Sequence, residues 1–127
     1  MSLQTVARQF VDLCNQGRNF DVMEKMYAPD IVSVEASGEE VSGKRPVIDK
    51  SRRWGAANTI HSEKVRGPFF DTADGAAARS AGQFAVHFTF DVTPRSTGQR
   101  VTLEEVGIYT VKDDQITREQ FYYEGDR

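Results

Sequence analysis

The hydrophobic pattern is clearest in the last third of the chain, where apolar and polar residues alternate along three runs. One face of the first run, 84–92, carries every second residue, namely Phe84, Val86, Phe88, Phe90 and Val92. A period of two is typical of a half-buried strand. Turn-forming residues at 94–98 and 113–114 separate this run from two further β-rich runs, 101–111 and 116–123. The pattern predicts an antiparallel meander of three strands.

The first half of the chain shows helical spacing instead. Apolar residues at i, i+3, i+4 and i+7 over 3–14 predict an amphipathic helix that Ser2 caps. A second, short helix is expected after Asn19 and before Pro29, and a third begins near Pro46, because proline suits the first turn of a helix. The buried side of the second helix is expected to hold Phe20, Met23, Met26 and Tyr27.

Two more strands are predicted from β-branched content and alternation, at 30–36 and 60–66. In the first of them Val32, Val34 and Ala36 are expected on the buried face, opposite Ile31, Ser33 and Glu35. Residues 37–40 and 71–81 are predicted as loops, the latter alternatively as an extended hairpin tip. Helices that precede a run of antiparallel strands predict an α+β fold, with three helices packed on a strongly curved sheet that forms a conical cavity.

Composition narrows the class of protein. The 127 residues predict a single domain, 1–127, and 39% hydrophobic with 28% charged residues is ordinary for a soluble globular protein. A net charge of -3 with no basic stripe argues against a nucleic-acid partner. No apolar run approaches the roughly 18 residues of a membrane span, and one cysteine permits no intramolecular disulfide. We therefore expect a cytoplasmic protein with no membrane partner.

Several stretches resemble the nuclear transport factor 2-like superfamily, and within it the SnoaL-like, polyketide cyclase-like branch. Residues 27–35 and 42–48 resemble its opening, and 105–123 its closing strands; 61–62, 67–69 and 91–93 add shorter similarities. The resemblance covers nearly the whole chain and implies a cystatin-like fold. It also implies a homodimer packed through the outer face of the sheet. Relatives include isomerases, cyclases, epoxide hydrolases and binding modules without catalysis, so the activity stays open.

The residues that some relatives use in catalysis are replaced in this chain. The ketosteroid isomerase pattern has a tyrosine in the first helix, a base in the first strand and an acid in a later strand. The matching positions here fall near Phe10 or Cys14, at Ala36 and close to Gly107. The Asp-Arg-Asp relay of the epoxide hydrolases lacks an arginine that the pattern places inward. An acid or histidine beside an enolisable substrate, as in polyketide cyclases, remains open in altered positions.

Two acids share a strand face with aromatic residues and are the candidate catalytic groups. Glu105 has the parity of Tyr109, and Glu119 has the parity of Phe121 and Tyr123. In an apolar cavity, desolvation and mutual repulsion would raise the pKa of at least one of them toward neutrality, which suits general acid–base catalysis. The alternative is that both acids face solvent or pair with arginines on neighbouring strands.

The predicted ligand pocket combines polar groups with aromatic walls. Its candidate residues are Glu35, Trp54, His61, Phe88, Phe90, Tyr109, Phe121 and Tyr123. A tyrosine hydroxyl among apolar residues needs a partner, and Tyr109 or Tyr123 beside Glu119 would satisfy both groups. No histidines and carboxylates have metal-ligand spacing, so we expect no metal and no cofactor.

Two hypotheses about function follow. The first is a pocket for a small hydrophobic or carbonyl-containing ligand in a homodimeric domain, with isomerase- or cyclase-type carboxylate chemistry on a cyclic or carbonyl substrate. The second is a non-catalytic binding or dimerisation module, whose cavity is filled with side chains and whose outer sheet recognises a partner.

Overall fold

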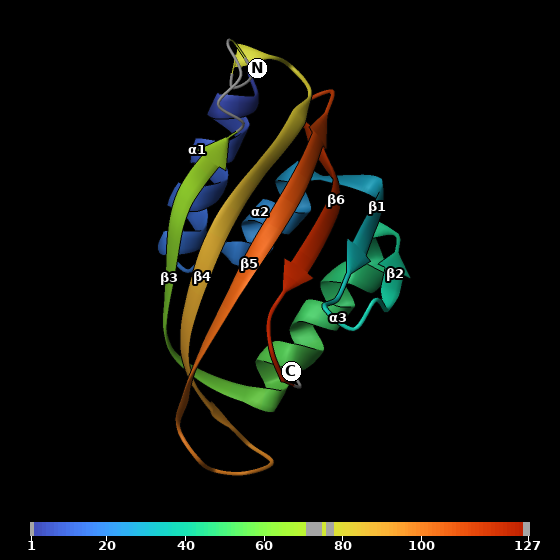
Figure 1. Ribbon diagram of the computed structural model, residues 1–127. Coiled ribbons are helices and arrows are strands. Elements are labelled where there is room, and N and C mark those ends of the chain that lie inside the picture. Colours follow the sequence, from blue (N-terminus) through green and yellow to red (C-terminus); the bar gives the residue numbers. More distant parts are fainter. Residues whose placement is uncertain (1, 71–74, 76–77, 126–127) are drawn as a thin grey trace.

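A computed structural model describes residues 2–70, 75 and 78–125 of the chain (Figure 1). The described residues form three helices, α1 Leu3–Asn15, α2 Asn19–Met26 and α3 Lys44–Ala57, and one sheet of six strands. The strands are β1 Tyr27–Val34, β2 Glu40–Ser42, β3 Asn58–Phe70, β4 Gly82–Pro94, β5 Val101–Lys112 and β6 Gln115–Tyr122.

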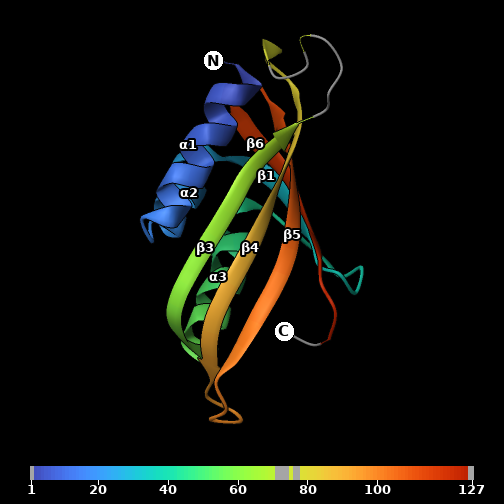
Figure 2. The same cartoon turned by 60° about the vertical axis from the view of Figure 1, so that its left-hand side comes forward.

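The sheet is curved and open, and its strand order is β2-β1-β6-β5-β4-β3. Neighbouring strands are antiparallel except for β1 and β6, which are parallel. All three helices lie on the concave face, as the views in Figures 1 and 2 agree. The predicted α+β fold, with three helices on a curved sheet, is therefore confirmed.

The core forms where α1 packs along β3 and reaches β4 and β5 with its aromatic side chain. All five apolar residues of the predicted stripe over 84–92 are buried. The Phe10 ring of α1 lies 5.5 Å from that of Phe84 and 4.4 Å from that of Tyr109, centroid to centroid. The N-terminus of α1 is capped as predicted, since the Ser2 hydroxyl accepts a hydrogen bond from the backbone N–H of Thr5.

The segment around Pro29 differs from its prediction. Helix α2 ends at Met26, and Pro29 lies inside β1, where the pairing with β6 shifts register between Tyr27 and Val32. Proline has no N–H to donate to a neighbouring strand, so an irregular stretch of the ladder accommodates it. Tyr27 thus belongs to a strand, and Phe20, expected to be buried, is 43% exposed. The strand β2 occupies part of the predicted loop 37–40.

The turn between β5 and β6 forms as expected, although neither central residue is a glycine. Asp113 and Asp114 both have positive φ, 52° and 63°, and Lys112 pairs with Gln115 around them. Two central residues with positive φ match the twist of the flanking strands, and aspartate tolerates this conformation better than most residues. The tight turn fixes which residues of β6 face inward.

The segment 71–81, predicted as a loop or an extended hairpin tip, is only partly described. Residues 71–74 and 76–77 lie outside the described residues. Among the helices that are described, none is both long and apolar enough to cross a membrane.

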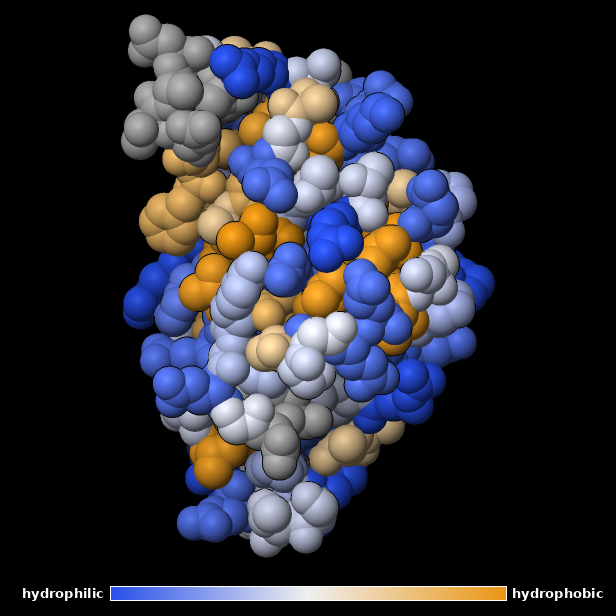
Figure 3. Space-filling view, turned by 45° about the vertical axis from the view of Figure 1, so that its right-hand side comes forward, coloured by the Kyte–Doolittle hydropathy of each residue, from blue (hydrophilic) through white to orange (hydrophobic). Residues whose placement is uncertain are grey.

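None of the helices formed by the described residues lies on the convex face of the sheet (Figures 1 and 2). Figure 3, which looks toward part of this face, shows apolar patches interrupted by hydrophilic side chains. Val106 and Tyr122 are paired across β5 and β6 and are 36% and 50% exposed. His87 pairs with Val106 from β4, so it lies on this outer face, away from the buried stripe.

We predict that Gly107→Ala lowers the free energy of unfolding by about 1–3 kcal/mol, because an added methyl group overpacks the core. A Cβ atom at this position would lie 2.8 Å from Cε2 of Tyr109 and 3.1 Å from Cε2 of Phe88. The Tyr109 ring has no room to retreat, since it is wedged among the rings of Phe10, Phe84 and Phe121. Urea denaturation measures the change.

The matched control is the same substitution in helix α3. A Cβ at Gly55 would meet no heavy atom within 4 Å. Gly55→Ala should raise the free energy of unfolding by up to about 1 kcal/mol, because alanine loses less conformational entropy in a helix. Equal effects of the two substitutions would contradict the packing described for Gly107.

Candidate functional site

A wide, open cavity of about 1350 Å³ lies between the concave face of the sheet and the three helices. Aromatic side chains stack along its wall: the Phe88 and Phe90 ring centroids are 5.6 Å apart, and Trp54 lies 5.3 Å from Phe90. The structure brings to this cavity most of the residues predicted for a site, namely Glu35, Trp54, His61, Phe88, Phe90, Glu105, Phe121 and Tyr123.

Two predicted residues, Tyr109 and Glu119, lie behind the cavity wall rather than on it. Each is only 2% exposed. The Tyr109 ring stacks on Phe84 at 5.3 Å and covers Gly107, so it fills the core beneath the cavity. Glu119 faces Tyr109 across β5 and β6 and points toward β1. Neither side chain lines the cavity that the other predicted residues share.

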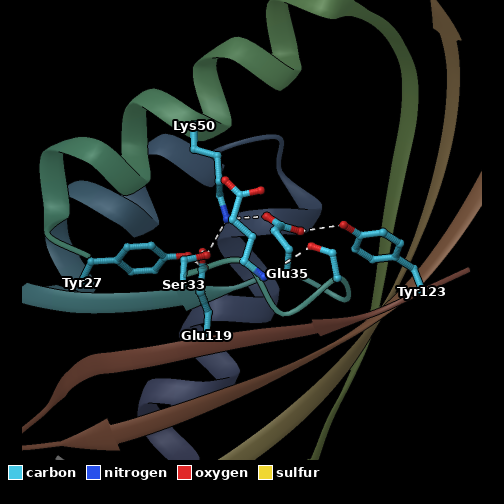
Figure 4. A network of polar contacts seen from close by, with 8 residues as sticks. Tyr27, Ser33, Glu35, Lys50, Glu119 and Tyr123 are labelled. Carbon is cyan, nitrogen blue, oxygen red and sulfur yellow. Dashed lines mark hydrogen bonds and ion pairs between the residues drawn. The ribbon is translucent and has the colours of Figure 1, made fainter. Parts of the chain in front are cut away.

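Glu119 is a buried carboxylate whose two oxygens both accept hydrogen bonds from β1. The Tyr27 hydroxyl donates to one oxygen, and the Ser33 hydroxyl donates to the other at 2.7 Å (Figure 4). The parallel pairing of β1 with β6 places Ser33 opposite Glu119 in register. The expectation that Tyr109 or Tyr123 would bond to Glu119 is therefore wrong, because β1 supplies both donors and Tyr123 donates to Glu35 instead.

Lys50 of α3 connects this buried carboxylate to the cavity. Its ammonium group donates to the Ser33 hydroxyl and to Oε1 of Glu35, both at 2.5 Å. It also lies 5.4 Å from the centre of the Phe121 ring, within the range of a cation–π contact. The other oxygen of Glu35 accepts a hydrogen bond of 2.8 Å from the hydroxyl of Tyr123.

These contacts form one continuous polar chain, which we call the Glu35–Glu119 network. It consists of Tyr27, Ser33, Glu35, Lys50, Glu119 and Tyr123. One end reaches into the core at Glu119, and the other reaches the cavity, which Glu35, Lys50 and Tyr123 line (Figure 4). The network therefore presents an anion and a cation side by side on a cavity wall that also carries aromatic side chains.

The electrostatics of Glu119 follow from its burial. Burial raises the pKa of Glu119. The hydrogen bonds from Tyr27 and Ser33 and the positive charge of Lys50 lower this pKa, but they do not cancel the rise. The negative charge of Glu35 raises it further. The repulsive neighbour is thus Glu35 rather than the expected Glu105. Glu105 lies four residues along β5 from Tyr109, which faces Glu119, a separation of about 14 Å along the strand.

Tyr27 keeps its proton beside this carboxylate. Burial, followed by the charge of Glu119 and the hydrogen bond between the two groups, raises the pKa of Tyr27 well above its ordinary value. The phenol therefore remains a hydrogen-bond donor throughout the neutral pH range.

Three members of the network were absent from the predicted site, and the sequence contains a signal for one of them. Lys50 lies three residues after the buried Val47 and four before Trp54, so helical spacing places it on the inner stripe of α3.

Ser33 was expected on the outer face, which is wrong. Ile31 and Ser33 are both 0% exposed and Glu35, directly after β1, lines the cavity, so these three residues form the inward face of this segment. Val34, on the other face, is buried as well.

His61 lies at the rim of the cavity and not within the network. Its Nε2 atom is 2.8 Å from Oγ1 of Thr93, and both side chains are at the surface. The ring is therefore held by a neighbouring strand, at the open side of the cavity.

We predict a pH-dependent difference in stability between the wild type and Glu119→Gln. A carboxyl whose pKa is higher in the folded state binds its proton more tightly when folded, so its contribution is greatest at low pH. The free energy of unfolding of the wild type, minus that of the variant, should fall as the pH rises above about 4.3, the pKa of an exposed glutamate. Urea denaturation at several pH values measures both, and a difference independent of pH would contradict the burial of an ionisable Glu119.

Comparisons with known proteins place this architecture. The model of the SnoaL-like domain matches residues 1–123. One similar structure is that of a protein from Mesorhizobium loti, with 40% sequence identity and a TM-score of 0.85. That protein is provisionally assigned as a SnoaL-like polyketide cyclase and, in brackets, as a carbohydrate phosphatase. The match covers 97% of this chain and 100% of that one. A search of curated proteins found no match.

More distant structures share the fold alone. An NTF2-like protein of unknown function from Cytophaga hutchinsonii is 14% identical with a TM-score of 0.69, covering 94% of this chain and 97% of that one. A protein from Xanthomonas campestris, provisionally assigned as a polyketide cyclase, is 21% identical with a TM-score of 0.64, covering 97% and 93%. The match of the family model over nearly the whole chain shows that this protein belongs to the SnoaL-like domain family.

Proposed function

We propose that the cavity binds a small, largely apolar ligand with a carbonyl group, and that Glu35 and Lys50 transfer a proton at the carbon next to that carbonyl. The observation that carries the proposal is the contact of 2.5 Å between the Lys50 ammonium and the Glu35 carboxylate on the cavity wall. The aromatic lining favours an apolar ligand. Exposed apolar side chains at the mouth, Phe20 and Ile60, are consistent with its entry.

The proposed step needs one base and one cation. The Glu35 carboxylate removes the proton from the carbon next to the carbonyl, and the electron pair of the C–H bond becomes the C=C bond of an enolate. Lys50 donates a hydrogen bond to the carbonyl oxygen, where the negative charge develops. In an isomerisation, a C=C bond conjugated with the enolate lets protonated Glu35 return the proton to the far carbon of the resulting dienolate. In a cyclisation, the enolate carbon attacks a second carbonyl of the ligand, the C=O π electrons move to its oxygen, and protonated Glu35 returns the proton to that alkoxide.

The geometry supports Glu35 as this base. A carboxylate offers about four lone-pair positions, and the bonds from Lys50 and Tyr123 occupy two of them. In this proposal Glu119 is a positioning residue, which acts on Lys50 through Ser33 without touching the ligand. Glu105 lines the aromatic part of the cavity beside Phe88, where it contacts the ligand rather than the reacting proton.

The similarity to the Mesorhizobium loti protein supports the class of reaction, since that protein is assigned as a polyketide cyclase. Isomerisation and cyclisation of carbonyl compounds both begin with an enolate. The roles proposed for Glu35 and Lys50 rest on the geometry of the cavity and not on this similarity, because a shared fold leaves the activity open.

We predict that Glu35→Gln slows exchange of the acetyl protons of 2-acetylnaphthalene with D₂O by about a hundredfold or more, because removing a general base costs about that factor. The probe is an enolisable aromatic ketone, and proton NMR follows the loss of its methyl signal. Glutamine retains the shape of the side chain and its hydrogen-bonding capacity, so circular dichroism and the melting temperature should change little.

Glu40→Gln is the matched control, because Glu40 lies on the exposed strand β2 and does not line the cavity. It should exchange the probe at the wild-type rate. Binding of the ketone with no acceleration by the wild type would replace this proposal with a non-catalytic binding module.

We also propose that two copies associate through the convex face of the sheet. The exposed pair Val106 and Tyr122 supports an apolar contact there, and a twofold axis would bring the same patch of each copy together. Ile108, also outward-facing on β5 and half-buried, extends the patch.

We predict that Val106→Lys shifts the protein from dimer to monomer, because the substitution places a charge in the apolar contact. Sedimentation velocity over a range of concentrations measures the change. Phe20→Lys, at an exposed aromatic residue on the helical side, is the control and should leave the dimer intact. A wild-type chain that sediments as a monomer at every concentration would refute the proposal.

A further inference from the structure

A second polar group faces the same cavity from the far side of the sheet. Glu63 of β3 has the strand parity of Val65, which is 4% exposed, and it pairs with Phe90, so its side chain points inward. It lines the cavity together with Asn19. The order of the strands places β3 at one edge of the sheet and β1, which leads to Glu35, near the other edge.

The turn between α1 and α2 holds this carboxyl group in place. Asn15, at the end of α1, bonds to the backbone of Val65 twice, donating at 2.9 Å and accepting at 2.8 Å. Asn19, the first residue of α2, donates at 2.7 Å to Oε2 of Glu63. Both amides therefore attach the helical layer to β3, and the second also orients the carboxyl group.

Only one donor satisfies this group within the described part of the chain. Asn19 supplies the one hydrogen bond that the structure records to Glu63, and no described lysine or arginine forms an ion pair with it. Burial raises the pKa of Glu63, and the bond from Asn19 opposes the rise. A half-buried carboxyl group with acceptor positions to spare gains from a further hydrogen-bonding partner.

We propose that Glu63 binds a hydroxyl group at the far end of the ligand, opposite the carbonyl group whose oxygen accepts a hydrogen bond from Lys50 and whose neighbouring carbon faces Glu35. This inference rests on the proposed function and adds the second polar end of the ligand. A hydroxyl group both donates and accepts, so it matches a carboxyl group in either protonation state. The ligand class is therefore a fused-ring or linear aromatic ketone with a hydroxyl group on the edge opposite the carbonyl.

The width of the sheet is compatible with such a ligand. From β1 to β3 there are four strand spacings, which amount to about 19 Å between backbones on a flat sheet. Curvature shortens this span, and the side chains of Glu35 and Glu63 extend into it from both ends. Glu63 and Glu35 are also offset along the strands, since Glu63 aligns through Phe90 with Leu103 and Glu35 lies near the level of Gly107. A ligand of two or three fused rings is of the order of size that such a separation accommodates.

The test compares 2-acetylnaphthalene with 6-acetyl-2-naphthol, which differ only in a hydroxyl group on the ring edge opposite the acetyl group. We expect the naphthol to bind the wild type about tenfold tighter or more, because a hydrogen bond to a charged group contributes at least that factor. In Glu63→Leu the ratio of the two affinities should fall to about one. Ligand-detected NMR titration measures both compounds on both proteins.

Two further variants keep the test decisive. Glu63→Gln, which conserves volume and can still hydrogen-bond, serves if the leucine variant does not fold, and it should reduce the ratio partly. Glu40→Leu, on the exposed strand β2, is the control and should retain the wild-type ratio.

The outcomes separate this inference from the function it rests on. Equal affinities in the wild type, or a ratio that survives in both Glu63 variants, would overturn the role of Glu63 while ketone binding stands. If neither compound binds to the wild type, both the subsite and the proposed function are wrong.

Discussion

The burial of one carboxylate, that of Glu119, organises much of this structure. An ionised carboxyl group in a protein core is costly unless donors surround it. Tyr27 and Ser33 of β1 supply those donors, and they reach Glu119 only because β1 runs parallel to β6 in one particular register. Helix α3 must also be positioned against β1, since the ammonium group of its Lys50 donates to Ser33. The pairing of β1, β6 and α3 is thus tied to the satisfaction of a single buried charge.

The same constraint brings charge to the cavity wall. Lys50 is linked to two carboxyl groups. It reaches Glu119 through the Ser33 hydroxyl and donates directly to Glu35, whose other oxygen accepts a hydrogen bond from Tyr123. The cavity consequently has a polarised pair on the side of β1 and α3, aromatic walls along β4, and a separate carboxyl group, Glu63, on β3. Both proposals about the ligand rest on this arrangement, since they assign proton transfer to one wall of the cavity and recognition of a hydroxyl group to the opposite one.

Part of the site follows from local pattern and part does not. Strand parity places the inner stripe of β4 and puts Glu105 and Phe121 on the cavity side, since every second residue of an antiparallel strand shares a face. Helical spacing would also have placed Lys50 inward. For β1 the wrong face was predicted to point inward, because apolar residues occur on both faces of this strand, Ile31 on the inward face and Val34 on the other, and both are buried.

The amino-acid sequence by itself determined the α+β class, the positions of the main turns and the succession of elements except for the short strand β2, because periodicity, caps and turn residues act over a few neighbours. Even the Asp113–Asp114 turn was expected from the tolerance of aspartate for positive φ. Only the tertiary structure decided which tyrosine meets Glu119 and whether two acids lie together. Tyr27 and Glu119 are 92 residues apart in the sequence and meet through a parallel pairing, and contacts of this kind depend on strand order and register rather than on local pattern.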